Sequence, residues 1–446
     1  MDLGKRLEDV TVIGAAGKMG SGIALLLAIE MTKRKLAAKA PEGAYLLHLV
    51  DTGEGALRGL TDYLRVQAVK AAEKSIVSLR PLFADRADLV ENGEVIEEFA
   101  RAVGRRVHLS TDVAAARGSH LVFEAIVENE DIKLAVYRRL REVCGPETYF
   151  LTNTSSIPIA VLDDKAGLDG RVLGFHFYNP PPVQKLVELI TGPRTRPDLV
   201  ALARELGKTL RKSIIPANDV AGFIGNGHFT RDGLHGIAEV EALAKELGHV
   251  PAVYLVDKVS RDWLLRPMGI FQLIDYVGVD VFQLILKVMS KHLSDPKLHS
   301  DFVDRLMDLG IKGGQTSSGA QKDGVLRYEK GKPVAVFDLE RKDYVAFDPE
   351  GWTRDADAKL GAHPNAALSW KGLSKDSGKQ EKLKAYFGAL KASPALGAQL
   401  ARRYHEASLA TGKMLVQTGV AASSEDVNAV LTLGFFHVYG PVNDYL

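Results

Sequence analysis

The chain has 446 residues, of which 46% are apolar and 25% are charged, a composition that predicts a globular protein of two or three domains. Its formal net charge of +1 provides no overall field for nucleic acid or an anionic membrane, and its longest apolar run, residues 23–29, is too short to cross a bilayer. Cys144 is the only cysteine, so we exclude internal disulfides, predict no metal site, and expect a reducing compartment, the cytoplasm.

The first predicted elements are a strand, a glycine turn and a helix. Residues 10–14 form a short apolar strand, GAAGKMGSG follows, and an apolar helix begins at residue 23. Glycines let a backbone approach a pyrophosphate, whose charge is stabilised by the N-terminus of the helix. The spacing G-x-x-G-x-x-G is one residue longer than the commoner motif, and a glycine turn that only connects two elements is the alternative. We predict that this turn binds a dinucleotide through Gly14, Gly17, Met19 and Gly20.

An acidic residue, Asp51, ends the second predicted strand, residues 45–50. A carboxylate at this place hydrogen-bonds the adenosine ribose and repels a 2′-phosphate, so it predicts NAD rather than NADP. Asp51 lies 37 residues after Gly14, where about 20 is typical, and residues 30–43 are predicted to extend the first helix and add a loop. The alternative interpretation of Asp51 is a simple strand cap.

Strands and helices alternate over the following hundred residues. Residues 56–99 are predicted to be helical and amphipathic, and the predicted strand at residues 121–127 ends at Glu128. Such alternation predicts a doubly wound sheet, in which ligands bind beyond the carboxyl ends of the strands. One shared site is indicated because these residues all fall at predicted strand ends: Gly14, Asp51, Glu128, Ser155 and His176.

A histidine and a carboxylate follow on two consecutive predicted strands. The strand at residues 172–175 ends at His176, prolines stiffen the turn at residues 179–182, and the returning strand at residues 186–190 carries Glu188. A carboxylate on one imidazole nitrogen fixes the tautomer and leaves the other nitrogen available to take a proton. The alternative is an interior histidine bonded to a backbone carbonyl, with Glu188 facing solvent.

The rest of the chain is predicted to be helical. Asn226 lies near the start of a predicted helical substrate or closure domain, residues 217–315. The segment PMGIFQLIDY resembles the terminal YGPVNDYL, which predicts that residues 316–446 form a second helical unit, a degenerate repeat of the first. The expected fold class is α/β, with a Rossmann-type doubly wound NAD-binding domain over residues 1–216, followed by all-α C-terminal domains.

Six segments, in the same order, resemble the L-3-hydroxyacyl-CoA dehydrogenases, in their longer form with two helical units and no hydratase domain. The segments are VTVIGAAGKMGSGIA, VFEAIVENEDIKLAVYRRL, TNTSSIPI, LGFHFYNPPPVQKLVELI, DVAGFIGN and PMGIFQLIDYVGVD. The resemblance implies NAD-dependent oxidation of an L-3-hydroxyacyl-CoA to a 3-ketoacyl-CoA, as in β-oxidation or related acyl-CoA degradation. It also leaves a homodimer open, because short family members dimerise through their single helical unit.

The resemblance implies a catalytic role for four residues. His176 would be the general base, Glu188 its partner, and Ser155 and Asn226 would hold the substrate oxygen. Gly227 departs from the family, which usually has arginine after this asparagine, and this departure bears on acyl-chain preference.

The resemblance also implies contacts to the two ligands. Glu128 and Lys133 would contact the nicotinamide side of the cofactor, Asn179 would lie near the substrate, and Lys74 would contact coenzyme A. Two alternatives stay open: a dehydrogenase of a free hydroxy acid or sugar acid, and a non-catalytic NAD-binding structural protein. The presence of both members of the histidine and glutamate pair favours an enzyme.

Overall fold

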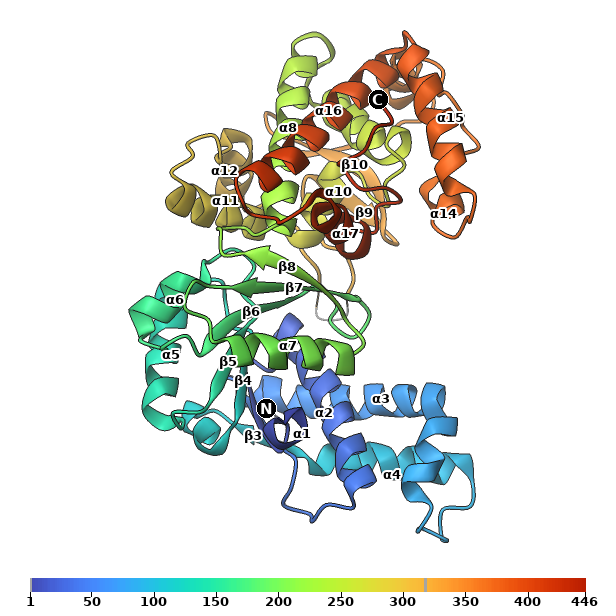
Figure 1. The fold of residues 1–446 in the computed structure, drawn as a ribbon. Coiled ribbons are helices and arrows are strands. Elements are labelled where there is room, and N and C mark those ends of the chain that lie inside the picture. The colour runs from blue at the N-terminus through green and yellow to red at the C-terminus, as the bar shows by residue number, and fades with distance from the viewer. Residues whose placement is uncertain (1, 317–318) are drawn as a thin grey trace. The chain divides into compact units, whose positions relative to one another are not determined.

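A computed structural model describes residues 2–316 and 319–446, and the chain divides into two compact units, Met1–Asp219 and Val220–Leu446 (Figure 1). Residues 317 and 318, which belong to the predicted second helical unit, lie outside the described residues. Among the residues described, no helix is both long and apolar enough to cross a membrane.

An eight-stranded sheet forms the centre of the first unit, in the order β3-β2-β1-β4-β5-β6-β7-β8. Neighbouring strands are parallel except β6 and β7, which pair antiparallel. The helices α5 and α6 lie on one side of the sheet and α2 and α7 on the other (Figure 1), so the predicted doubly wound sheet is confirmed. The strands are β1 Asp9–Ile13, β2 Leu46–Val50, β3 Val107–Ser110, β4 Leu121–Glu124, β5 Tyr149–Thr152, β6 Val172–Phe177, β7 Leu186–Thr191 and β8 Ser213–Asn218.

The helices of the first unit follow the predicted alternation. The predicted helical region at residues 56–99 consists of two helices, which pack against each other. Pro81 opens a short 3₁₀ turn after the first, and Glu91 and Glu94 form a capping box that starts the second. The helices are α1 Leu3–Arg6, α2 Lys18–Ala38, α3 Glu54–Leu79, η1 Arg80–Phe83, α4 Asn92–Arg105, η2 Val113–Gly118, α5 Glu130–Val143, α6 Ile159–Ala166 and α7 Pro197–Thr209.

The core of the first unit lies on both faces of the sheet. Every residue of β4, β5 and β6 is buried, as expected for central strands that helices cover on both faces. The strand β4 ends at Glu124, three residues before the predicted end. The helix α2 continues to Ala38, which confirms the predicted extension of the first helix and accounts for the long interval before Asp51.

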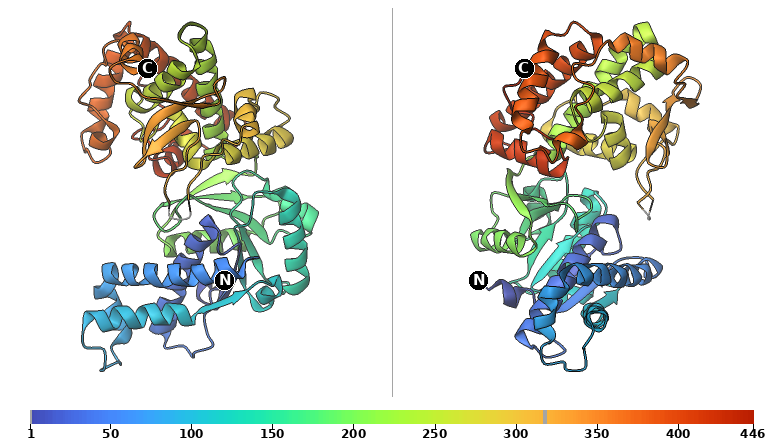
Figure 2. Two further views of the ribbon diagram at one scale, coloured as in Figure 1. Left: turned by 180° about the vertical axis from the view of Figure 1, so that it is seen from behind. Right: turned by 90° about the vertical axis from the view of Figure 1, so that its right-hand side faces the viewer.

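The second unit is helical, apart from a three-stranded antiparallel sheet in the order β11-β10-β9 (Figure 2). Gly278, whose φ of 116° is available mainly to glycine, separates the helix at residues 270–277 from the helix at residues 279–293. The elements are α8 Gly225–Leu247, α9 His249–Lys258, the π-helical turn η3 Val259–Trp263, α10 Ile270–Val277, α11 Val279–Leu293, α12 Asp301–Asp308, β9 Leu326–Glu329, β10 Lys332–Asp338, β11 Asp343–Ala346, α13 Trp352–Leu360, α14 Trp370–Leu373, α15 Lys379–Ala392, α16 Leu396–Gln417 and α17 Ser424–Gly434.

The end of the chain folds back on the beginning of the second unit. The long helix α16 packs along α8, where the Tyr404 hydroxyl donates to the carbonyl of Asp232 at 2.7 Å. Arg403 forms two hydrogen bonds with the carboxylate of Glu239, at 2.8 and 2.7 Å. These contacts make the C-terminal helices part of the same core as α8.

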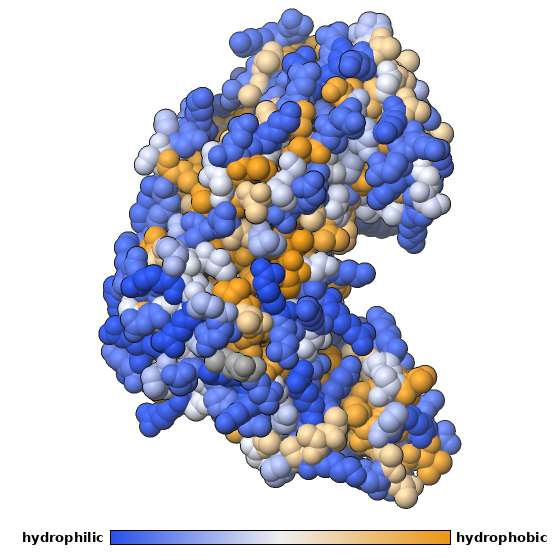
Figure 3. All heavy atoms as spheres, in the orientation of Figure 1, coloured by the Kyte–Doolittle hydropathy of each residue, from blue (hydrophilic) through white to orange (hydrophobic). Residues whose placement is uncertain are grey.

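Polar side chains cover most of the surface shown in Figure 3. Apolar atoms gather at the free ends of α3 and α4 in the first unit, where Val77 and Val90 are exposed. Single exposed valines of this kind are common on globular proteins and indicate no partner by themselves.

Candidate active site

The glycine turn between β1 and α2 fits a dinucleotide. Gly14 has a φ of 76°, and a Cβ on Gly20 would collide with the carbonyl oxygen of Gly14. Gly17 is the N-cap of α2 and, having no side chain, does not itself cap the first amides of the helix. A turn without Cβ atoms at the N-terminus of a 21-residue helix suits the pyrophosphate of NAD.

Asp51 lies beside this turn, as predicted. Its Oδ2 accepts a hydrogen bond from the backbone amide of Ala16 at 2.9 Å. The contact arises because β1 and β2 are neighbouring parallel strands, with Ile13 opposite Val50, so the residues that follow both strands meet at one edge. Asp51, which is predicted to bind the ribose, is therefore hydrogen-bonded to the glycine turn, which is predicted to bind the pyrophosphate.

His176 and Glu188 are cross-strand partners on β6 and β7. The His176 Nδ1 lies 2.9 Å from Glu188 Oε2, and Glu188 is completely buried. The alternative in which Glu188 faces solvent is therefore wrong. When Nδ1 carries the proton, Nε2 is the basic nitrogen that a general base needs. The strand β6 continues to Phe177, so His176 lies inside the strand rather than just after it.

Ser155 lies on the turn after β5, and Glu128 holds that turn. One carboxylate oxygen of Glu128 accepts from the Thr154 hydroxyl at 2.6 Å and from the amides of Ser155 and Ser156, both at 2.9 Å. Burial raises the pKa of Glu128, but Lys133 and these donors outweigh burial and hold the pKa below its usual value. An ionised Glu128 thus fixes the backbone that presents Ser155.

Glu124 is a buried charge that the sequence analysis missed. It ends β4, and its carboxylate accepts from Lys133 Nζ at 2.6 Å, from the Thr152 hydroxyl at 2.6 Å and from the Tyr137 hydroxyl at 3.2 Å. Burial lowers the pKa of Lys133, but Glu124 and Glu128 raise it above its usual value. A glutamate inside the apolar run at residues 121–127 was the signal that could have revealed it.

Two further residues that contact the strand–turn–strand segment or lie within it were also not predicted. The Tyr178 hydroxyl donates to Glu188 Oε2 at 2.8 Å. The Lys212 ammonium donates to the carbonyls of Pro181 and Gln184, and so holds the proline turn between β6 and β7. The Tyr178 contact lies within the predicted strand–turn–strand segment, and the Lys212 contacts join its turn to the residue before β8.

The contacts described above do not involve four of the predicted residues. Asn226 is the second residue of α8 and belongs to the second unit, which is described by itself. Lys74 is exposed on α3, while Met19 on α2 and Asn179 on the proline turn are half-buried. The roles predicted for these four residues remain predictions.

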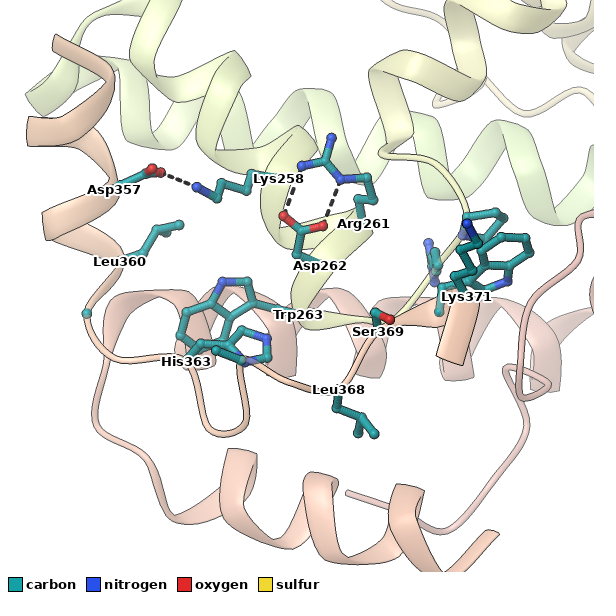
Figure 4. Close-up of a pocket in the computed structure, with 15 residues that line it drawn as sticks. Lys258, Arg261, Asp262, Trp263, Asp357, Leu360, His363, Leu368, Ser369 and Lys371 are labelled. Carbon is teal, nitrogen blue, oxygen red and sulfur yellow. Dashed lines mark hydrogen bonds and ion pairs between the residues drawn. The ribbon is translucent and has the colours of Figure 1, made fainter. Parts of the chain in front are cut away.

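A cavity of about 520 Å³ in the second unit lies among η3, α13 and α14 (Figure 4). Its walls include Trp263 and the ion pairs Lys258 with Asp357, at 2.6 Å, and Arg261 with Asp262, at 2.7 Å. None of the predicted site residues lines it. Lys258 and Arg261 are thus each paired with a carboxylate that also lines the cavity.

Comparison with protein families finds two matches. Residues 52–220 match the model described as 3-hydroxyacyl-CoA dehydrogenase, NAD binding domain. Residues 237–323 match the model described as 3-hydroxyacyl-CoA dehydrogenase, C-terminal domain. The first match begins after the glycine turn, whose assignment therefore depends on its geometry.

Individual relatives agree with these matches. The chain is 30% identical over 242 residues to a probable 3-hydroxybutyryl-CoA dehydrogenase of Deinococcus radiodurans, covering 52% of this chain and 82% of that protein. It is 30% identical over 325 residues to the human mitochondrial hydroxyacyl-coenzyme A dehydrogenase, covering 71% of this chain and 91% of that protein.

Solved structures support the fold. The crystal structure of Mycobacterium tuberculosis FadB2 matches with a TM-score of 0.55 and 28% identity, covering 72% of this chain and 99% of that one. A 3-hydroxybutyryl-CoA dehydrogenase structure from Escherichia coli has a TM-score of 0.64 and covers 98% of this chain and 90% of that one, which at 22% identity shows the fold alone.

Proposed function

Because the chain belongs to the 3-hydroxyacyl-CoA dehydrogenase family and is an NAD-dependent oxidoreductase, we propose that it oxidises an L-3-hydroxyacyl-CoA with His176 as general base. The observation that carries this proposal is the 2.9 Å contact between His176 Nδ1 and the buried Glu188 Oε2. Relatives named as 3-hydroxybutyryl-CoA dehydrogenases make a four-carbon acyl group the first substrate to test.

In the proposed reaction, His176 Nε2 takes the proton of the substrate hydroxyl. NAD, when bound, supplies the acceptor for the hydride from C3, so the products are a 3-ketoacyl-CoA, NADH and a proton. The imidazolium that forms on His176 is stabilised by the negative charge of Glu188. Glu188 also keeps the proton on Nδ1 before the reaction, which leaves Nε2 in its basic form.

The other site residues bind and orient in this proposal. Ser155 and Asn226 donate hydrogen bonds to the oxygen that changes from hydroxyl to ketone, and Asn179 lies near the substrate. Lys74 binds coenzyme A, and Lys133 and Glu128 support the nicotinamide side. The NAD pyrophosphate binds at the turn of Gly14, Gly17, Met19 and Gly20, and Asp51 binds the ribose.

The test is NADH formation with a panel of 3-hydroxyacyl-CoA thioesters of short, medium and long acyl chains, together with the corresponding free acids. We expect turnover with at least one thioester and none with its free acid. Higher activity with the free acids would favour the hydroxy-acid alternative. Absence of turnover with every compound, in a protein that still binds NAD, would favour a non-catalytic NAD-binding protein.

The cellular setting completes the proposal. Oxidation of a 3-hydroxyacyl-CoA is a step of fatty-acid or related acyl-CoA degradation, and we propose that the enzyme acts there in the cytoplasm. The homodimer remains a proposal for the full chain, to be measured by analytical ultracentrifugation.

A further inference from the structure

The carboxylate of Glu188 accepts a hydrogen bond from a second donor besides His176. Tyr178 is the first residue after β6, and its hydroxyl donates to Glu188 Oε2 at 2.8 Å. The same oxygen accepts from His176 Nδ1 at 2.9 Å. The two rings are neighbours, with centroids 4.9 Å apart. One oxygen of the fully buried Glu188 carboxylate is therefore hydrogen-bonded to both the Tyr178 hydroxyl and the His176 ring.

We propose that Tyr178 is a positioning residue that sets the basicity of His176 by sharing its carboxylate oxygen. The inference rests on the proposed function, in which His176 is the general base. The Tyr178 hydroxyl donates to Glu188 Oε2 and stabilises the carboxylate in its ionised form. A carboxylate that is already stabilised by this donor gains less from the attraction of an imidazolium at His176. The carboxylate of Glu188 therefore supports the cation of His176 less strongly than it would without the Tyr178 hydroxyl.

The donor is permanent over the pH range in which an imidazole titrates. Burial raises the pKa of Tyr178 well above its usual value, and Glu188 raises it further, so the hydroxyl keeps its proton. Tyr178 thus acts as a fixed neutral donor and does not act as a second base.

Two other titratable groups of the first unit hold turns that follow or join its strands. Lys212, which precedes β8, donates to the carbonyls of Pro181 and Gln184. Glu128, after β4, accepts from the turn that carries Ser155. The Tyr178 hydroxyl reaches His176 through the one oxygen of Glu188 that both side chains contact.

The test measures the pKa of the His176 ring by NMR in the full chain, with His176→Gln used to assign its signals. Tyr178→Phe should raise this pKa by roughly half a unit to one unit, since one hydrogen bond to the carboxylate is lost. The matched control is Tyr149→Phe. Tyr149 is the first residue of β5, and its hydroxyl donates to Asp198 rather than to Glu188. The control should leave the pKa of His176 unchanged.

Two further variants make the test independent of any damage to folding. Site-specific 3-fluorotyrosine at position 178, a stronger donor of nearly the same shape, should lower the pKa of His176. In a Glu188→Gln background, Tyr178→Phe should no longer shift it, because the shared carboxylate is gone. An unchanged or lowered pKa in Tyr178→Phe, or an equal shift in the Glu188→Gln background, would overturn the proposal.

Kinetics separate this inference from the proposed function. The acidic limb of the kcat/KM profile should move to higher pH in Tyr178→Phe, with the affinity for NAD unchanged. The NMR measurement needs no substrate, so it tests Tyr178 even where the proposed substrate is wrong. Normal turnover by His176→Gln would refute the proposed base, whereas an unmoved His176 pKa in Tyr178→Phe would refute only the role of Tyr178.

Discussion

Lys133 Nζ and Glu124 Oε1 lie 2.6 Å apart, with side chains that are 1% and 0% exposed. Glu124 ends β4 and Lys133 lies on α5, so the pair ties the strand to the helix that follows it. Two buried charges lose their hydration, and their mutual attraction offsets that loss only while both are present. Removal of one partner therefore leaves an uncompensated charge in the core.

Lys133→Met should lower the free energy of unfolding by about 3–5 kcal/mol, measured by urea denaturation. The matched control is Lys165→Met, since Lys165 forms a pair of the same length, 2.6 Å, with Glu130 but is 52% exposed. A pair in contact with water should cost about 1 kcal/mol or less. Equal losses in the two variants would contradict the importance of burial.

His176→Gln should reduce kcat by about 10²–10⁴-fold, because it removes general-base catalysis while the glutamine amide still hydrogen-bonds the substrate. Glu188→Gln should also lower kcat, because the amide cannot stabilise the imidazolium. NAD binding, measured by calorimetry, should survive both changes. The control is His108→Gln on β3, an exposed histidine that should leave kcat unchanged, and near-normal turnover by His176→Gln would refute the mechanism.

Gly20→Ala should abolish tight NAD binding, because its Cβ would collide with the carbonyl oxygen of Gly14 and force the turn open. We expect the Kd for NAD to rise at least about tenfold, roughly 1.4 kcal/mol. The control is Gly59→Ala on α3, where a Cβ meets no described atom within 4 Å and NAD binding should not change. Retained affinity in Gly20→Ala would show that NAD does not bind at this turn.

The enzyme should prefer NAD to NADP by at least about tenfold in kcat/KM, because the Asp51 carboxylate repels a 2′-phosphate. Asp51→Ser should reduce that ratio. Asp112→Asn, which changes an exposed carboxylate after β3, should leave the ratio as it is. Equal use of the two cofactors by the unaltered protein would contradict the assignment of Asp51.

His405 should make the second unit sensitive to acid. It is buried on α16, its Nε2 lies 3.1 Å from Asn443 Oδ1, and burial lowers its pKa from 6.5 to about 4. Because the unfolded chain binds the proton more tightly, this stability is complete above pH 6.5 and is lost as the pH falls toward 4. By pH 5 the loss is about 2 kcal/mol.

His405→Gln should therefore lose about 2 kcal/mol less than the unaltered protein between pH 7.5 and pH 5, measured by urea denaturation at both values. His299→Gln changes an exposed histidine and should retain the full pH dependence. If both variants kept the same pH dependence as the unaltered protein, the acid sensitivity would have another origin.

The sequence alone was sufficient for the features that depend on neighbouring residues. Alternating apolar segments predicted the doubly wound sheet, and the spacing of Gly14, Gly17 and Gly20 predicted the turn after β1. The proline turn at residues 179–182 predicted that β6 returns as β7. Strands, turns and helices each have a characteristic periodicity or composition over a few residues, and these patterns can be recognised in a single sequence.

Only the tertiary structure decided which side chains meet. The antiparallel register places His176 opposite Glu188, whereas a slip by one residue would have turned Glu188 to the other face. Tyr178 lies two residues after His176 and therefore faces the same carboxylate, a contact that the period of a strand permits but does not require. Lys133 meets Glu124 because β4 and α5 pack together. Such contacts depend on sheet order, register and packing, and these are set by the whole core rather than by the separation of two residues along the chain.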